Sequence, residues 1–486
     1  MNPQFIFFEC YSERYPHRVH WTTGFRRLFR MHQLKVADEG IEKSHGIVRI
    51  RIWFSGSADF ERGRVRLARL FAARASGDAP QAERGNPDGL FYALQQYPLF
   101  RRLWMGSVLA QLGQWMQTVA LGWVALDLTD SAFFVGLVSF MAGIPFIVVA
   151  IPAGAIIDRV ERRKVLMFCQ CAAALLAIVV AIDVISGFVE PWHLLIAAFL
   201  NGSLLSVLAP TQQALTPSLV DRKDLTNAIG LTSAGNNLTR VFGPSLAGAI
   251  IGVSGTGEAF IVQAIALGAA FMLIAMTKFP KQHIAPRVVK PGAALEGLRY
   301  IFQRDDLRGL FLLALIPTFF TFPYIQFLNV FARDILQIGP SGLGLLMASS
   351  GSGAVIGSLI VARGRKAEGQ GMMLIGTTIL YASLILCMSA SRSIWMTVPL
   401  LIAAGGIGSW YMAQNNSLVQ HRITEDVRGR VMSAYMLNNG LLPLGAMPMG
   451  IIAGLTSVPI AVAVGASMTI LLTALLAVTS PALRSL

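Results

Sequence analysis

Residues 154–166 read GAIIDRVERRKVL, an apolar run that ends in a cluster of charges before a second apolar run begins. The carboxylate of Asp158 leads this cluster, where it can pair with an arginine or receive the positive N-terminal end of a helix. We therefore expect a latch that holds one conformation closed, while a solvated loop explains its last three basic residues equally well. The predicted latch consists of Gly154, Asp158, Arg159, Arg162 and Arg163.

The composition on either side of this loop indicates a membrane protein. Of the 486 residues, 54% are hydrophobic and only 14% are charged, too apolar for an ordinary soluble protein. The net charge of +14 does not indicate a nucleic-acid partner, because the positive residues fall in short loops between hydrophobic runs. The four cysteines have neither a paired framework nor metal-ligand spacing, so we expect no metal and no cofactor.

Twelve apolar stretches are long enough to cross a bilayer, whose hydrocarbon core takes about 20 helical residues. We expect an all-α integral membrane protein with twelve transmembrane helices. The expected spans are 103–126, 133–157, 163–186, 192–216, 226–252, 258–278, 307–330, 341–363, 371–390, 394–415, 430–454 and 457–479.

Lysine and arginine gather in alternate loops, which predicts the orientation of the chain in the membrane. The opposite loops hold almost none, with Arg333 and Arg392 as the exceptions. Both termini are therefore expected in the cytoplasm. The basic loops lie at 159–164, 222–223, 278–304, 363–366 and 422–430.

The longest connection between spans, residues 279–306, divides them six and six. We expect residues 93–278 to form an N-terminal six-helix bundle and residues 307–486 a C-terminal one. The connection is expected to be a cytoplasmic linker in which residues 293–304 form a short amphipathic helix.

The two predicted bundles resemble each other in sequence. A shift of about 203 residues places GAII at 154–157 on GSLI at 357–360, and the basic pair at 162–163 on that at 365–366. Both bundles then run in parallel topology. Two such halves, packed about an axis along the membrane normal, enclose a central substrate path.

Residues 1–92 differ in composition from the rest and contain no segment long enough to span a membrane. We expect a poorly structured basic tail that contributes no stable fold, or a spurious segment from an upstream start. A basic amphipathic helix on the inner leaflet is the alternative.

The loop at 154–166 resembles the G-x3-D-R-x2-R-R-K cytoplasmic motif of the major facilitator superfamily. Glu161 stands where that motif usually has glycine, a variant similar to the branch of the enterobactin exporter and bacterial drug-efflux proteins. The runs GQWMQ at 113–117, LTDS at 128–131 and EGLRY at 296–300 add to the likeness. The resemblance implies a twelve-span alternating-access transporter of the bacterial inner membrane, usually an exporter driven by proton exchange.

Arg240 lies near the middle of the predicted fifth span, at about the depth of the bilayer centre. A central arginine costs roughly 2.5–3.5 kcal/mol on insertion scales, so it is expected to face the bundle interior or a wet cavity. Three roles stay open for its guanidinium. It can bind an anionic or carbonyl-rich substrate, modulate a proton site, or donate a structural hydrogen bond to carbonyls of the first span.

The residues after Arg240 resemble the glycine-proline motif that is common among exporters of this superfamily. Gly243 and Gly248 permit close helix approach, and Pro244 removes a backbone hydrogen bond and permits a bend. A gate and ordinary helix packing both account for these three residues. Asp127, near the outer end of the first span, is the candidate for proton coupling, and the alternative is a helix-end acid that faces water.

Polar and aromatic residues on spans that should face the centre predict the substrate path. Their mixture of amides and aromatic rings suits a bulky, partly polar ligand. The expected path residues are Arg240, Asn236, Asn237, Gln111, Gln114, Trp115, Tyr324, Gln326, Trp410, Gln414 and Asn438.

Enzymatic activity is not expected, because the chain has no phosphate-binding loop, no H-E-x-x-H pair and no G-x-S-x-G elbow. We expect a monomeric exporter of a siderophore-like anion or an amphipathic drug, working in exchange for protons. Two alternatives stay open: import of an organic solute on the same fold, and a non-transporting membrane sensor or scaffold.

Overall fold

The computed structural model describes residues 9–11, 47–49, 89, 91–149, 160–277, 279, 293–362, 369–436 and 438–485. Contacts along the chain divide it into two compact units, residues 1–84 and 85–486. In the first unit the described residues form one antiparallel pair of strands, β1 (Glu9–Tyr11) and β2 (Ile47–Arg49). The rest of the predicted N-terminal tail lies outside the described residues.

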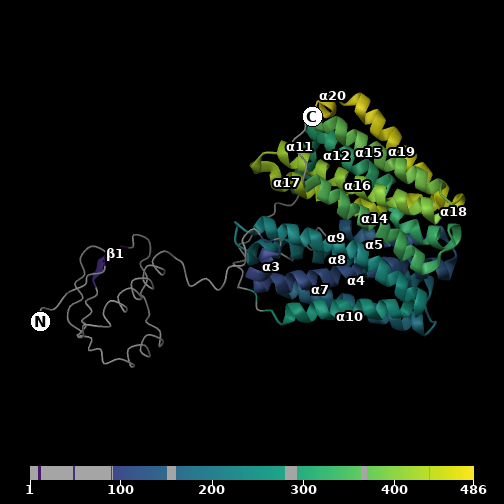
Figure 1. Ribbon diagram of the computed structural model, residues 1–486, viewed down its shortest axis with the longest axis horizontal. Coiled ribbons are helices and arrows are strands. Elements are labelled where there is room, and N and C mark those ends of the chain that lie inside the picture. The colour runs from purple at the N-terminus through teal and green to yellow at the C-terminus, as the bar shows by residue number, and fades with distance from the viewer. Residues whose placement is uncertain are drawn as a thin grey trace, which may run out of the picture. The chain divides into compact units, whose positions relative to one another are not determined.

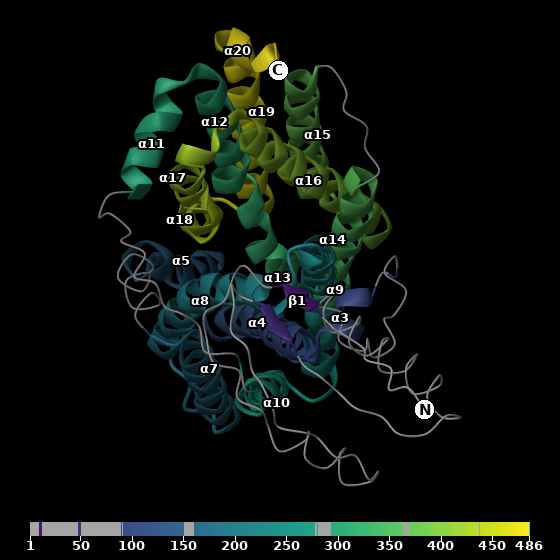
Figure 2. The same cartoon turned by 90° about the vertical axis from the view of Figure 1, so that its left-hand side faces the viewer.

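The described elements of the second unit are helices, which fall into two groups (Figures 1 and 2). The first group is drawn in blue and teal in Figure 1. It contains α3 (Tyr92–Gln96), α4 (Pro98–Thr129), α5 (Ala132–Val148), α7 (Arg162–Ile185), α8 (Pro191–Leu219), α9 (Leu225–Val253) and α10 (Thr256–Ala275). This group corresponds to the predicted N-terminal bundle.

The second group is drawn in green and yellow and corresponds to the predicted C-terminal bundle (Figure 1). It contains α11 (Ala293–Gln303), α12 (Asp305–Phe320), the 3-10 helix η1 (Phe322–Phe327), α13 (Leu328–Val330), the π-helix η2 (Phe331–Ile335), α14 (Gly339–Ala362), α15 (Gln370–Ala390), α16 (Ile394–Arg422), α17 (Glu425–Met436), α18 (Asn438–Leu455), α19 (Val458–Thr479) and α20 (Pro481–Arg484). The helix expected at 293–304 is α11.

Eight of the described helical segments are long and apolar enough to cross a membrane. They are α7, α8, α10, α12 through η2, α14, α15, α16 and α19. Helices α4 and α9 cover the first and fifth predicted spans but are not among the eight, and these are the helices that carry Gln111, Gln114 and Arg240. The described part of α5 and the apolar part of α18 are shorter. The count of twelve spans stays a prediction.

The seventh predicted span is not a regular α-helix over its whole length. The seventh is regular only to Phe320 and continues as the 3-10 and π turns, with Pro317 inside α12 and Pro323 at the start of η1. Proline cannot donate the backbone hydrogen bond of a regular helix, which accounts for the change of winding at this point.

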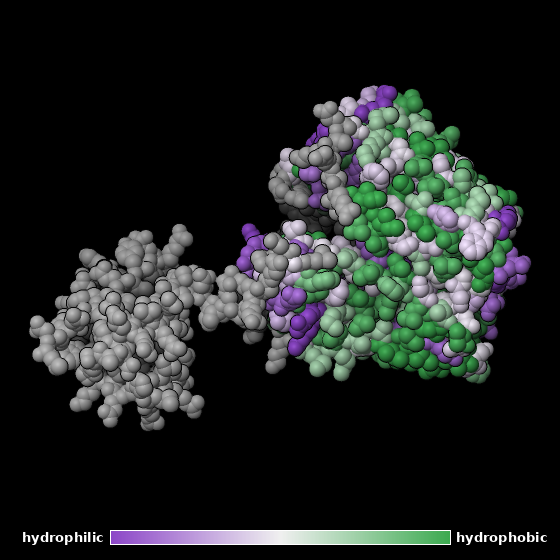
Figure 3. All heavy atoms as spheres, viewed as in Figure 1, coloured by the Kyte–Doolittle hydropathy of each residue, from purple (hydrophilic) through white to green (hydrophobic). Residues whose placement is uncertain are grey.

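The outward faces of both groups are apolar. Large hydrophobic side chains are strongly exposed there, among them Val253 and Trp395 at 87%, Val478 at 72% and Ile182 at 62%. Figure 3 shows hydrophobic residues spread over both groups on the face in view. Such a surface suits hydrocarbon and not water, as in a multi-pass membrane protein.

The two groups meet along two seams, α9 against α14 and α5 against α18. A Cβ added at Gly248 would lie 2.5 Å from the carbonyl oxygen of Pro340, and one at Gly143 would lie 2.5 Å from the Cβ of Pro443. Backbones therefore approach closely where the seams form. In the predicted order of spans, the fifth span contacts the eighth and the second contacts the eleventh. The eighth and eleventh are the second and fifth spans of the C-terminal half, so the same two positions pair in both seams.

Candidate substrate site between the two halves

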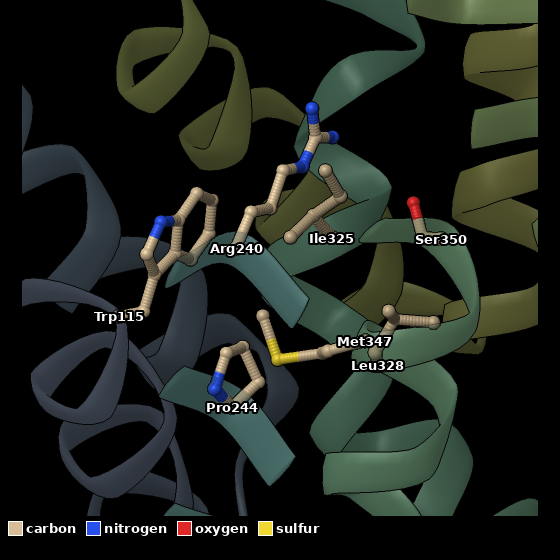
Figure 4. Close-up of a pocket in the computed structure, with 7 residues that line it drawn as sticks. All are labelled: Trp115, Arg240, Pro244, Ile325, Leu328, Met347 and Ser350. Atoms are coloured by element: carbon tan, nitrogen blue, oxygen red, sulfur yellow. The ribbon is translucent and has the colours of Figure 1, made fainter. Parts of the chain in front are cut away.

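Arg240 lies in a cleft between the halves with an empty volume of about 220 Å³ (Figure 4). Its lining comes from α4 and α9 on one side and from η1, α13 and α14 on the other. The lining residues are Trp115, Arg240, Pro244, Ile325, Leu328, Met347 and Ser350. Three of the residues singled out in the sequence, Trp115, Arg240 and Pro244, are therefore brought together.

The guanidinium of Arg240 stacks over an aromatic ring. Its central carbon lies 5.9 Å from the centre of the Trp115 ring, a distance at which the ring quadrupole attracts a cation. Figure 4 shows the side chain running past Ile325 with its nitrogens pointing away from Pro244. The contact with Trp115 leaves the hydrogen-bonding edge of the guanidinium open.

Among the described residues, no side chain or carbonyl forms a hydrogen bond or an ion pair with the Arg240 guanidinium, and neither cleft described here contains a carboxylate. Of the three roles left open for Arg240, the structural hydrogen bond to carbonyls of the first span is therefore not found in this part of the chain. The backbone of Arg240 is closely held, since a Cβ added at Gly351 of α14 would lie 3.0 Å from its carbonyl oxygen. The Arg240 backbone is fixed at the seam, and its guanidinium donors have no partner in the described part of the chain.

Tyrosine hydroxyls from the C-terminal half lie near Arg240. Tyr324 is buried and its hydroxyl is 3.1 Å from the hydroxyl of Ser350, which lines the cleft. Tyr381 is also buried against Phe322, with ring centres 5.0 Å apart, and its hydroxyl has no partner among the described residues. These rings lie behind the wall that this half presents to the cleft, which is apolar except for Ser350.

A second cleft, with an empty volume of about 210 Å³, lies between α4 and α8 in the N-terminal half. Its polar lining is entirely amide: Gln111, Gln114 and Gln212. Gln114 and Asn201 exchange hydrogen bonds of 3.1 and 3.3 Å, which fixes the orientation of both amides. The N-terminal half thus supplies one cation and several neutral hydrogen-bonding groups.

The other predicted path residues line neither cleft. Asn236 is exposed and Asn237, Gln326 and Trp410 are partly buried. Gln414 donates a 3.4 Å hydrogen bond to the backbone oxygen of Gln370, a contact within the C-terminal half. The side chain of Asn438 lies outside the described residues.

Sequence reasoning missed Ile325, Leu328, Met347 and Ser350. Three of them are apolar and look like ordinary packing residues in a hydrophobic span. Ser350 had a signal, because residues 349–352 read SSGS in the middle of an otherwise apolar helix. Small polar residues at such a place allow close helix contact and hydrogen bonding across helices.

The halves are joined by hydrogen bonds at the end of α4 that leads to Asp130, here called the Asp130 end. Asn329 donates a 2.6 Å hydrogen bond to the carbonyl of Gly122, and Arg333 donates a 2.9 Å hydrogen bond to the carbonyl of Leu126. Arg333 also pairs with Asp130. From Met116 to Leu126 every residue except Thr118 and Gly122 is buried. The structure is closed at this end.

Two of the predicted latch residues stabilise helix ends inside the N-terminal half. Arg162 donates a 2.9 Å hydrogen bond to the carbonyl of Ala214 in α8, and Arg163 donates one of 2.6 Å to the carbonyl of Ala275, the last residue of α10. A cation at the C-terminal end of a helix satisfies carbonyls that have no partner in the helix. Gly154, Asp158 and Arg159 lie outside the described residues.

The predicted gate residues divide between the site and the seam. Pro244 lines the cleft, and Gly248 is in the α9–α14 seam. A Cβ added at Gly243 would lie 2.5 Å from the Cβ of Trp115, so this glycine lets the tryptophan lie beside Arg240. Asp127 is exposed near the Asp130 end and lies in neither cleft.

Two apolar-faced helical halves that enclose a polar cleft define a membrane transporter of the major facilitator type. A family model described as transmembrane secretion effector matches residues 91–485, and the chain belongs to this family of the major facilitator superfamily. The match begins where the first described helix of the N-terminal half begins and leaves out the N-terminal tail.

Curated relatives of the chain include transporters of different cargo. The staphyloferrin A transporter of Staphylococcus aureus is 26% identical over 353 residues, which cover 71% of this chain and 87% of the relative. Macrolide efflux protein A of Streptococcus pyogenes is 23% identical over 73% of this chain and 87% of its own length. The enterobactin exporter of Salmonella typhi is 23% identical over 71% of this chain and 83% of its own length.

Solved structures confirm the fold. A bacterial homolog of the human lysosomal transporter Spinster, in an inward-facing and unoccupied conformation, superposes with a TM-score of 0.60 at 15% identity, covering 80% of this chain and 96% of that one. The nucleoside transporter NupG superposes with a TM-score of 0.61 at 14% identity, covering 78% and 98%. At such low identity these likenesses show the fold alone.

Proposed function

We propose that the chain is a secondary active transporter that exports a small organic molecule across the bacterial inner membrane, in exchange for protons. The observation that carries the proposal is the Arg240 cleft, which takes its lining from both halves. A ligand held there contacts both halves at once, so rocking of one half against the other changes the side to which it is exposed.

The substrate we propose is a siderophore-like anion or an amphipathic drug. The Arg240 donors, which have no partner among the described residues, support the anion, and the apolar wall of the C-terminal half supports an amphipathic body. Relatives named for a siderophore, for macrolide efflux and for enterobactin export support an exporter of this general kind.

The proposed orientation has both termini in the cytoplasm and twelve spans in all. The Asp130 end is then extracellular, and its closure supports an inward-facing assignment. Asp127 is the proposed proton-coupling residue. Its place beside the closed end supports this role, because a carboxylate there changes its surroundings when the halves rock.

Proton movement evoked by substrate in inverted membrane vesicles tests the proposal. Catechol siderophores, macrolides and lipophilic cations are screened against wild type and an Arg240→Ala control that is shown to be inserted. Proton release that depends on one ligand class and on Arg240 is expected. Movement in the opposite sense would support import. Silence with intact partner binding would support a sensor or scaffold.

A further inference from the structure

The two clefts are joined by one face of α4. Gln111, Gln114 and Trp115 are related by three and four residues, so their side chains lie on the same side of the helix. Trp115 lines the Arg240 cleft, and the two glutamines line the amide cleft. The two clefts therefore share α4 as a common wall.

The two clefts offer different chemistry to a ligand. In the first, a guanidinium without a hydrogen-bonded partner among the described residues prefers a carboxylate or another anion. In the second, the side chains of Gln111 and Gln212 likewise have no hydrogen-bond partner in the described part of the chain. An amide donates and accepts at once, so it recognises neutral amide, carbonyl or hydroxyl groups and gives no preference to charge.

The fixed amide pair decides where that second group binds. Asn201 is 9% exposed and is held by its two hydrogen bonds to Gln114, so neither of these amides is free to turn toward a ligand. Gln111 on α4 and Gln212 on α8 are left on opposite walls of the cleft. A neutral polar group between them can accept from one amide and donate to the other.

From this arrangement we infer that the substrate class is an organic acid with a second, neutral hydrogen-bonding group. Arg240 binds the anion, Trp115 stacks on the part that joins the two groups, and Gln111 and Gln212 bind the neutral group. Met347, Ile325 and Leu328 contact the apolar remainder. The inference rests on the proposed function, because it takes the two clefts to belong to one substrate path.

Equilibrium binding to the purified full chain in lipid nanodiscs tests the inference without requiring transport. Three probes share an aromatic ring: N-benzoylglycine has a carboxylate and an amide, 4-phenylbutyrate has only the carboxylate, and N-benzoylglycinamide has only amides. N-benzoylglycine is expected to bind at least 10-fold more tightly than either of the others. A cation of similar size, phenylbutylammonium, is expected to bind at least 100-fold more weakly than 4-phenylbutyrate.

Variants separate the two parts of the site. Arg240→Gln is expected to abolish the advantage of N-benzoylglycine over N-benzoylglycinamide. Gln212→Leu and Gln111→Leu, each as a single variant, are expected to abolish the tighter binding of N-benzoylglycine relative to 4-phenylbutyrate. The affinity for 4-phenylbutyrate is expected to stay at the wild-type value. Gln303→Leu, at an exposed position of α11, is the matched control and is expected to bind all probes as wild type does.

Two results would overturn the inference. The first is that a glutamine variant, shown by thermal unfolding to be folded, binds N-benzoylglycine and 4-phenylbutyrate more weakly by the same factor. The second is that the two acids bind no better than the neutral or cationic probes. These outcomes are distinct from failure of the proposed function. Selective binding of acids with no proton movement or flux would support the inferred site and reject transport. Flux without selectivity for acids would support transport and reject the inferred site.

Discussion

Removing the contacts that close the Asp130 end is expected to open it. Asn329→Ala removes a neutral amide hydrogen bond, worth about 1 kcal/mol, and Arg333→Ala removes a charge-assisted one, worth about 1.5–3 kcal/mol. The pair with Asp130 adds little, since that carboxylate is 85% exposed and screened by water. The double variant therefore loses about 3 kcal/mol of the free energy that favours the closed over the open state of the Asp130 end. The ratio of open to closed molecules rises about 100-fold.

Pulsed electron-electron distance measurements can follow this shift. Spin labels at Leu128→Cys in α4 and Trp395→Cys in α16 report the separation of the halves, in a background where the four native cysteines are replaced by serine. The double variant is expected to gain a population at longer distance. Arg392→Ala is the control, because in the described structure Arg392 donates only to the nearby carbonyls of Ser389, at the end of α15, and Ser391.

An unchanged distance distribution in the double variant, with the protein folded and inserted, would refute the reasoning. An equal broadening of the distance distribution in the Arg392→Ala control would also refute the reasoning, because a general loosening of the loops would then explain the change.

Two further changes test the packing of the halves. Gly248→Ala is expected to lower stability by about 1–3 kcal/mol, because its Cβ would meet the Pro340 carbonyl, whereas Gly230→Ala enters open space and should be neutral or slightly stabilising. Equal thermal unfolding of the two variants would contradict the close seam. Asn415→Leu breaks buried hydrogen bonds to α12 and α17 and is expected to cost about 2–3 kcal/mol. An unfolding temperature equal to that of wild type would argue against this crosslink.

Much of the architecture was predictable because hydrophobic length and loop charge report directly on membrane insertion. The helices of the structure cover the predicted spans over the described residues, and the linker helix α11 was predicted within one residue. Local irregularities were not predictable in the same way. Whether Pro323 merely bends a helix or changes its winding, as it does in η1, depends on how neighbouring helices satisfy the freed backbone groups.

The candidate site was partly predictable for a physical reason. Charge and polarity are conspicuous in an apolar helix, so Arg240, Gln111 and Gln114 stood out. The apolar lining residues did not, because Leu328 or Met347 facing a cleft has the same sequence pattern as one packed in a core. Gln414 shows the opposite failure: its polarity suggested the path, yet the structure gives it a backbone partner in its own half.

The most direct test of the central claim is the initial rate at which an organic acid selected by the proton assay enters inverted vesicles. Wild type, Arg240→Lys and Arg240→Gln are compared at equal amounts of inserted protein. If Arg240 binds the transported anion, Arg240→Gln loses at least 10-fold in rate, and Arg240→Lys, which keeps the charge, retains part of it. Transport of the acid by Arg240→Gln at the wild-type rate would contradict the account.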